Sequence, residues 1–212
     1  MSTTMAPTDA NTASKQSARV AQKIQKIREL YADAPEIGKA ALENGLPTLT
    51  QELEAPPNEQ TAGRIGLRQG KVSELCVFLP FVKGGAQRLR GLLQALEGNF
   101  HAADAVGTVH DMRFVFVDND TKLLFATAYD GDFDPYIDDF AAKIPNAMDL
   151  WLCNFEDFPG MRNPKAAADW IAKHQIAAEA WYVNSPNLAA AETRKLERVG
   201  KAVDELLDKI GG

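Results

Sequence analysis

Residues 108–129, TVHDMRFVFVDNDTKLLFATAY, decide the fold class. They contain two runs rich in β-branched and aromatic residues, Thr108–Val117 and Lys122–Tyr129. Between them lies Asp118-Asn119-Asp120, whose short polar side chains bond readily to turn backbone. The segment is therefore predicted to be a β-hairpin.

The residues on either side of the hairpin extend this pattern. Upstream, the apolar run Val72–Val82 ends at Gly84-Gly85 and predicts a buried strand, and Ala86–Leu96 has leucines at the three- and four-residue spacing of an amphipathic helix. Downstream, a second helix is expected, capped by Asp132 or Asp134, and its apolar face consists of Tyr136, Ile137, Phe140 and Ile144. Met148–Asn154 is predicted to be the last strand.

The element order βαββαβ predicts an α+β, ferredoxin-like antiparallel sheet with both helices on one face. The other face would be bare, so we expect it to be covered by flanking helices, by a ligand or by a second copy in a homodimer. The predicted organisation is a disordered tail (1–16), a helical N-terminal extension (17–70), the ferredoxin-like core (71–160) and C-terminal helices packing on the core (161–212).

The phrases GTVHDMRFVFVD and LLFATAYDGDFDPYIDDF, followed by an expected Trp-bearing strand, resemble the dimeric α+β barrel superfamily. The closest resemblance is to largely uncharacterised bacterial domains distantly related to dye-decolourising peroxidases and chlorite dismutases. It covers about residues 71–190, includes the stretch HQIAAEAWYVNSPNL (174–188), and implies a dimer and a possible haem. Haem-binding branches generally take their iron ligand from a helical histidine. Among His101, His110 and His174, only His174 is expected near a helix.

Composition narrows the function classes. The 212-residue chain has a net charge of −6, and residues 71–160 carry 14 acidic against 7 basic groups. An acidic core argues against nucleic-acid binding, which needs a basic face. No apolar run approaches the ~20 residues that span a bilayer, and the N-terminus has no hydrophobic signal core, so a cytoplasmic location is expected.

The candidate catalytic residues are His110, Asp111 and Arg113. Strict strand alternation would place His110 on the face of Met112 and Phe114, and Asp111 and Arg113 on the other face. His110 could serve as a general acid or base or contact a haem, and Arg113 could stabilise an oxyanion. The structural alternatives are a hydrogen-bonded, half-buried histidine and an Asp111–Arg113 ion pair within the chain or across a dimer.

The candidate ligand-binding residues are aromatic: Tyr129, Phe114 and Trp151, with Trp181 and Tyr182 as further candidates. They could line a pocket for a small planar or apolar molecule, although aromatic residues on strands are more often part of the core. No metal site is predicted, because the acidic run 130–134 lacks the glycine and the terminal glutamate of an EF-hand loop.

Three functions remain open. The first is an accessory or ligand-binding barrel domain that self-associates. The second is a haem- or quinone-dependent oxidoreductase of peroxidase or monooxygenase type, with a pocket near His110 and Arg113. The third is a scaffold that docks to a partner or a membrane surface through the basic helix 18–31, whose apolar stripe is Val20, Ile24, Ile27 and Tyr31.

Overall fold

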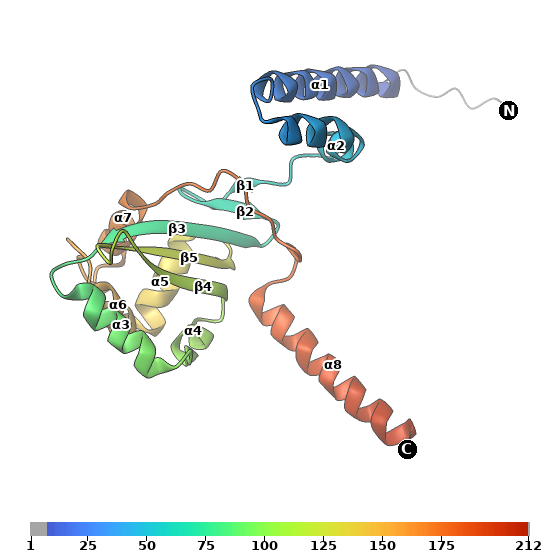
Figure 1. Ribbon diagram of the computed structural model, residues 1–212. Coiled ribbons are helices and arrows are strands. Elements are labelled where there is room, and N and C mark those ends of the chain that lie inside the picture. The colour runs from blue at the N-terminus through green and yellow to red at the C-terminus, as the bar shows by residue number, and fades with distance from the viewer. Residues whose placement is uncertain (1–7, 212) are drawn as a thin grey trace. The chain divides into compact units, whose positions relative to one another are not determined.

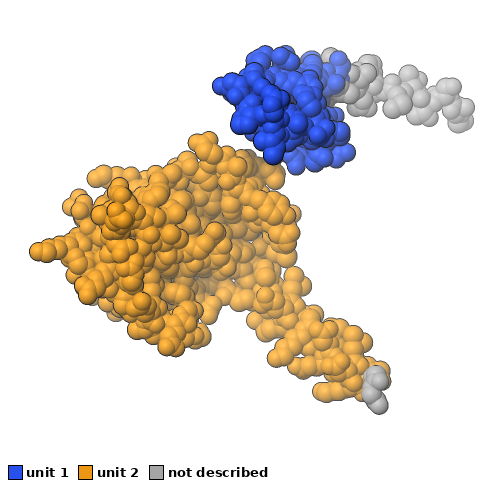
Figure 2. Space-filling view, viewed as in Figure 1, with its two compact units in different colours: residues 1–57 blue, residues 58–212 orange. Residues whose placement is uncertain are grey.

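The computed structural model describes residues 8–211, which form two compact units divided between Pro57 and Asn58 (Figure 2). The first unit is a pair of helices, α1 (Thr8–Leu30) and α2 (Glu36–Glu54). Residues 8–16, expected to be disordered, are helical, and residues 1–7 of that expected tail lie outside the described residues.

The apolar stripe of α1 is used within this unit. Val20 is only 5% exposed, and Arg28 makes a bidentate ion pair with Glu43 of α2 (2.8 and 2.7 Å). In the structure α1 thus packs on α2. The docking of this helix to a partner or a membrane surface stays a prediction.

The second unit is α+β, with a five-stranded antiparallel sheet (Figure 1). Its strands are β1 (Gln60–Thr61), β2 (Leu67–Gln69), β3 (Val72–Pro80), β4 (Val109–Val117) and β5 (Lys122–Asp130), in the spatial order β1-β2-β3-β5-β4. Its helices are α3 (Gly85–Leu96), α4 (His101–Val106), α5 (Phe133–Lys143), α6 (Pro145–Leu152), α7 (Pro164–Lys173) and α8 (Ala190–Gly211). None of the described helices is long and apolar enough to span a membrane.

The core lies between one face of the sheet and the helices. Alternate residues of the central strands, such as Leu75 and Val77 of β3 and Leu123 of β5, are buried against Ile137 and Phe140 of α5. The hairpin predicted from residues 108–129 is confirmed as β4 and β5, and its turn residues 118–120 all have positive φ. The predicted helix near Asp132 is also confirmed, as α5.

The predicted last strand, Met148–Asn154, is wrong: most of these residues form helix α6. Pro145 occupies the first turn, where its missing N–H costs nothing, and Trp151 and Leu152 are buried while Leu150 is 55% exposed. A short apolar run is compatible with the two-residue period of a strand and with the 3.6-residue period of a helix, so the sequence alone did not separate the two. The ferredoxin-like strand order is consequently not confirmed.

Three short segments lie along β3 on the side away from β5. β2 pairs with its first residues, Gln175 bridges Val77, and Phe155 bridges Phe81 just after its end. A ferredoxin-like fold would have one full strand here. The interrupted edge matters because the chain after residue 176 leaves β3 and runs towards the bare face of the sheet.

Two leucines test α6 directly. In a strand, residues 150 and 152 would share a face, whereas in this helix Leu152 is 9% exposed and Leu150 is 55% exposed. We expect Leu152→Ala to lower the free energy of unfolding by about 2–5 kcal/mol and Leu150→Ala by less than about 0.5 kcal/mol. Urea unfolding followed by tryptophan fluorescence reports this unit alone, because all three tryptophans lie in it. Equal losses from the two variants would contradict the helix.

Candidate functional site

A β-bulge brings the candidate catalytic residues to one face of the sheet. The register between β4 and β5 shifts between Val109 and Asp111, so His110 is an extra residue opposite β5. His110 therefore lies on the side of Asp111 and Arg113, towards Asp130. The prediction that His110 shares the face of Met112 and Phe114 was wrong, since strict alternation does not hold across a bulge.

These three residues line a cleft of about 440 Å³ on the face opposite the core. Its floor includes the small side chains of Ala126 and Ala128 from β5. β3 contributes polar groups, Glu74 and Cys76, and residues 181–184 form the remaining side. The cleft therefore combines a flat apolar floor with polar groups at its margins.

The segment that covers the cleft is tied to β3 and to the β2–β3 turn. The amide of Phe78 donates to the carbonyl of His174 (3.1 Å), and the amide of Ile176 donates to the carbonyl of Cys76 (2.9 Å). Further along, Gln69 Nε2 donates to the Trp181 carbonyl (2.6 Å), and the Lys71 amide donates to the Pro186 carbonyl (2.7 Å). We call residues 174–188 the strap.

Gly70 permits this close approach. Its φ is +59°, and a Cβ there would lie 2.5 Å from the Pro186 carbonyl oxygen. Only glycine combines that backbone angle with that spacing at no steric cost. The open face was expected to be covered by flanking helices, by a ligand or by a second copy, whereas in the structure a non-helical segment of the chain, the strap, lies over part of it.

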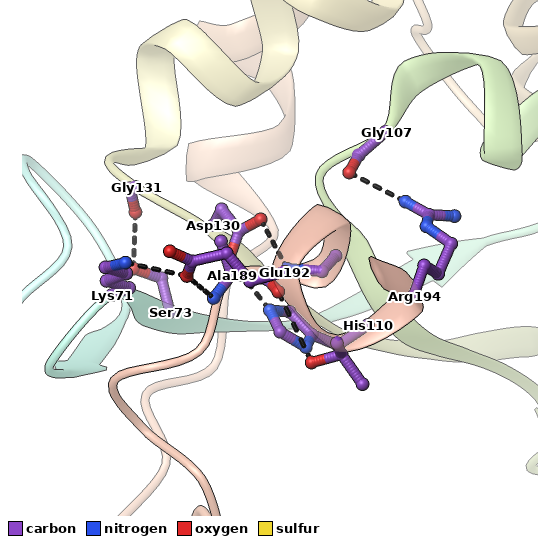
Figure 3. Close-up of polar contacts among 11 residues, drawn as sticks. Lys71, Ser73, Gly107, His110, Asp130, Gly131, Ala189, Glu192 and Arg194 are labelled. Carbon is purple, nitrogen blue, oxygen red and sulfur yellow. Dashed lines mark hydrogen bonds and ion pairs between the residues drawn. The ribbon is translucent and has the colours of Figure 1, made fainter. Parts of the chain in front are cut away.

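Asp130 joins the site to the start of α8 (Figure 3). Its Oδ1 lies 2.8 Å from His110 Nε2, and its Oδ2 accepts a hydrogen bond from the Ala190 amide (2.9 Å). Nearby, Lys71 Nζ donates to Glu192 (2.7 Å), and Arg194 donates to the Gly107 carbonyl (2.8 Å). His110 is thus held in place by a carboxylate that also fixes the first turn of α8.

Beyond this first turn, α8 extends away from the sheet and its apolar side chains are exposed (Figure 1). This differs from the expectation that the C-terminal helices pack on the core. α7 does pack there, through Ala167 and Ile171.

Glu74 is the most unusual polar group of the cleft, and sequence reasoning missed it. It is only 5% exposed, its Oε1 accepts a hydrogen bond from the Leu67 amide (3.0 Å), and burial raises the pKa of its carboxyl. A buried ionisable group with a raised pKa in a cleft marks a candidate functional site. The sequence feature that could have pointed to Glu74 is a charged residue inside a largely apolar strand, VSELCVF.

The other charged groups of the cleft are paired. Arg113 donates to Asp111 (2.9 Å), and His110 contacts Asp130. The structure thus shows the pairing expected within the chain for Asp111 and Arg113. Glu74 makes no ion pair with any residue in the described part of the chain.

The predicted ligand-binding aromatics lie on the opposite face, in the core. Phe114 and Trp151 meet edge to face, with ring centroids 5.4 Å apart, beside an apolar cavity of about 50 Å³. Tyr129 lines neither this cavity nor the cleft. It is fully buried and stacked on Tyr136 (3.8 Å), and its hydroxyl has no hydrogen-bond partner among the described residues. Trp181 and Tyr182, the further candidates, do line the cleft.

The donor groups do not fit a haem. His101 is exposed on α4, which was expected to be loop, and His174 Nδ1 lies 2.8 Å from the Trp170 carbonyl oxygen. Of the three, only His110 lines the cleft, and its Nε2 is already bonded to Asp130. Across residues 8–211 no group of three or more metal-ligating side chains comes together.

Comparisons with known proteins give no family for the chain. No protein-family model, no curated protein and no solved structure matches it. The relation to dimeric α+β barrels therefore rests on the sequence resemblance alone, and the structure supports only the coarser class, α+β with an antiparallel sheet.

The raised pKa of Glu74 makes a prediction about stability and pH. The folded state holds the Glu74 proton more tightly than the unfolded state, so the wild type loses stability as pH rises above the unfolded pKa of about 4.3. Glu74→Gln cannot ionise, and its amide oxygen can still accept from Leu67. Urea unfolding between pH 4 and pH 8 should show the variant gaining stability relative to the wild type with rising pH.

Glu192→Gln is a control of opposite sign. The hydrogen bond from Lys71 lowers the pKa of Glu192, so its ionised form stabilises the fold above the unfolded pKa, and that contribution disappears on acidification. This variant should lose stability relative to the wild type as pH rises. A pH-independent difference for Glu74→Gln would show that the Glu74 carboxyl titrates normally.

Proposed function

We propose that residues 58–212 form a small-molecule-binding domain that holds a planar ligand in the open-face cleft. The observation that carries this proposal is the cleft itself, which is built from three strands and covered by the strap. Ligand sites typically have volumes of 300–1,000 Å³ and combine apolar walls with a few placed polar groups. The 440 Å³ cleft falls in this range.

The shape of the floor favours a planar molecule. Ala126 and Ala128 present only methyl groups, so a ring can lie flat above β5. Trp181 supplies an aromatic surface from the strap, and offset or edge-to-face arrangements of two rings are favourable. Glu74 and Cys76 are placed to orient polar atoms at the edge of such a ring.

Binding is better supported than catalysis. His110 is engaged by Asp130, and Arg113 is engaged by Asp111. A carboxylate on Nε2 leaves the Nδ1 nitrogen of His110 as a candidate base, so this pair alone does not separate binding from catalysis. An oxyanion site, however, needs uncommitted donors, and Arg113 is committed to Asp111. We therefore rank a ligand-binding domain above a haem- or quinone-dependent oxidoreductase.

Filling the cleft tests this function. Ala128→Leu adds three carbons to the floor on the solvent side of β5, so ligand binding should be lost while the core is left intact. Ligands can be found by a thermal-shift screen of planar aromatic fragments. Every fragment that binds here should lose at least about tenfold in affinity in the variant, because its volume is excluded.

The matched control is Val115→Leu, which enlarges a side chain on the same face but outside the cleft. It should leave all fragment affinities unchanged. Fragments that bind wild type and Ala128→Leu equally well would place the ligand elsewhere. A strong Soret band in protein purified from its own host would instead favour the haem alternative.

Self-association is a second candidate function, supported by α8. Five apolar side chains of this helix, spaced alternately by three and four residues, are between 46% and 73% exposed: Leu196, Val199, Val203, Leu206 and Ile210. This is the a/d spacing of a coiled coil. A helix rarely leaves such a stripe in water, so a covering partner is expected.

We call this stripe of five apolar residues the seam. Its sequence is compatible with packing against the seam of a second copy in parallel orientation. Val203 and Ile210 are β-branched residues at a positions and Leu206 is at a d position, the pattern of two-stranded parallel pairs. The first heptad has the reverse order, with Leu196 at a and Val199 at d, so only the second half of the helix follows this pattern. The g positions include Lys195 and Lys209. An antiparallel pair would bring these lysines together, whereas a parallel pair places Lys195 opposite Gly200, so charge repulsion selects the parallel dimer.

Sedimentation velocity of the full chain tests this pairing. Val203→Lys should shift the protein towards monomer, because a lysine in the seam would be buried without a partner. Asp204→Lys changes the neighbouring residue away from the seam and should leave the dimer intact. A monomeric wild type, or a dimer that tolerates Val203→Lys, would contradict self-association through α8.

A further inference from the structure

We propose that the ligand of the cleft is an organic cation with a flat, delocalised head group, such as an amidinium or guanidinium, and that Glu74 is its counter-ion. This inference rests on the proposed function, because it assigns a ligand class to the same cleft. It follows from how the charged groups of the cleft are paired, from the burial of Glu74 and from the aromatic residues of the strap.

Three acidic residues lie in or beside the cleft, and two of them have a charged or hydrogen-bonding partner side chain. Asp111 is paired with Arg113 at 2.9 Å, and Asp130 is occupied by His110 and by the Ala190 amide. Glu74 makes no ion pair with a described residue. Among the described residues that line the cleft, Glu74 is therefore the one carboxyl group without a counter-charge, and the one guanidinium, that of Arg113, is already paired with Asp111.

The placement of Glu74 makes this carboxyl costly without a ligand. More than nine tenths of the residue is buried, and the single hydrogen bond it accepts from the described residues goes to Oε1. A buried carboxylate without a positive partner loses several kcal/mol of solvation unless it is protonated. A cation in the cleft would supply the missing charge, and two N–H groups of an amidinium could bond to one carboxylate.

The strap provides the second half of a cation site. Trp181 and Tyr182 both line the cleft. The face of an aromatic ring attracts a cation, with tryptophan the strongest, and the attraction grows when water is excluded. A carboxylate on one side and aromatic rings on another would hold a planar cation between them, whereas an anion would meet Glu74 directly.

Three isosteric probes separate this inference from the function on which it rests: benzamidinium, neutral benzamide and anionic benzoate. Binding to the full chain can be followed by the indole N–H resonance of Trp181, assigned with Trp181→Phe. We expect benzamidinium to bind at least about tenfold more tightly than benzamide, because its hydrogen bonds to Glu74 would be charge-assisted. Benzoate should bind most weakly.

Glu74→Gln is the decisive variant. It keeps the size and the acceptor for Leu67 but removes the charge, so the preference for benzamidinium over benzamide should disappear while benzamide still binds. Glu179→Gln removes an exposed acid of the strap that does not line the cleft, and it should keep the full preference. Trp181→Leu should weaken benzamidinium through loss of the π face, which gives a test independent of Glu74. Because this variant lacks the indole, its binding is followed by thermal shift, with the wild type measured in the same way.

The outcomes distinguish the two claims. Equal binding of benzamide and benzamidinium, tighter binding of benzoate, or an unchanged preference in Glu74→Gln would overturn the cation assignment and leave the cleft as a ligand site. Absence of binding by all three probes would also overturn it. If, in addition, no fragment responds to Ala128→Leu, the proposed function fails as well.

Discussion

The second unit depends on how the outer edge of β3 is completed. A strand in the middle of a sheet must satisfy backbone hydrogen bonds on both sides, and β3 finds a full partner only in β5. On its other side, β2, residues 174–176 and residue 155 each supply a short piece. Because residues 174–176 take the middle of this edge, the following strap is directed over the face that the helices leave bare. The cleft is the space between strap and sheet.

The β-bulge at His110 and the carboxylate of Asp130 then give the cleft its chemistry. The extra residue turns His110 towards Asp130, which also receives the first amide of α8. Because the Asp130 carboxylate bonds to both His110 and the Ala190 amide, it ties the chain just after the strap to the sheet. What remains without a counter-charge is Glu74, a buried acid on the central strand whose hydrogen bond comes from the Leu67 amide. Native proteins rarely bury an acid that has no positively charged partner, so a cationic ligand would complete the cleft.

The sequence predicted those parts of the fold that depend on local pattern. The hairpin, α3 and α5 follow from periodicity and turn residues, and they are present. Residues 148–154 were misassigned because this seven-residue run is short enough to fit the period of a strand or of a helix, and the burial of Trp151 and Leu152 is decided by tertiary packing. The trio His110, Asp111 and Arg113 was predicted to be near a pocket, and the structure gathers it in one cleft, although the bulge could not be foreseen. Phe114, Tyr129 and Trp151 were assigned to a ligand but belong to the core, as aromatic residues on a sheet often do.

Amide hydrogen exchange tests most directly whether the strap is docked on β3. The amides of Phe78 and Lys71 donate to the strap carbonyls of His174 and Pro186, so a docked strap should protect both against exchange. They should exchange at rates close to those of the amides that bond between β3 and β5. Free exchange of Phe78 and Lys71, with the β3–β5 ladder still protected, would mean that the strap is detached in solution, and the cleft as described would not exist.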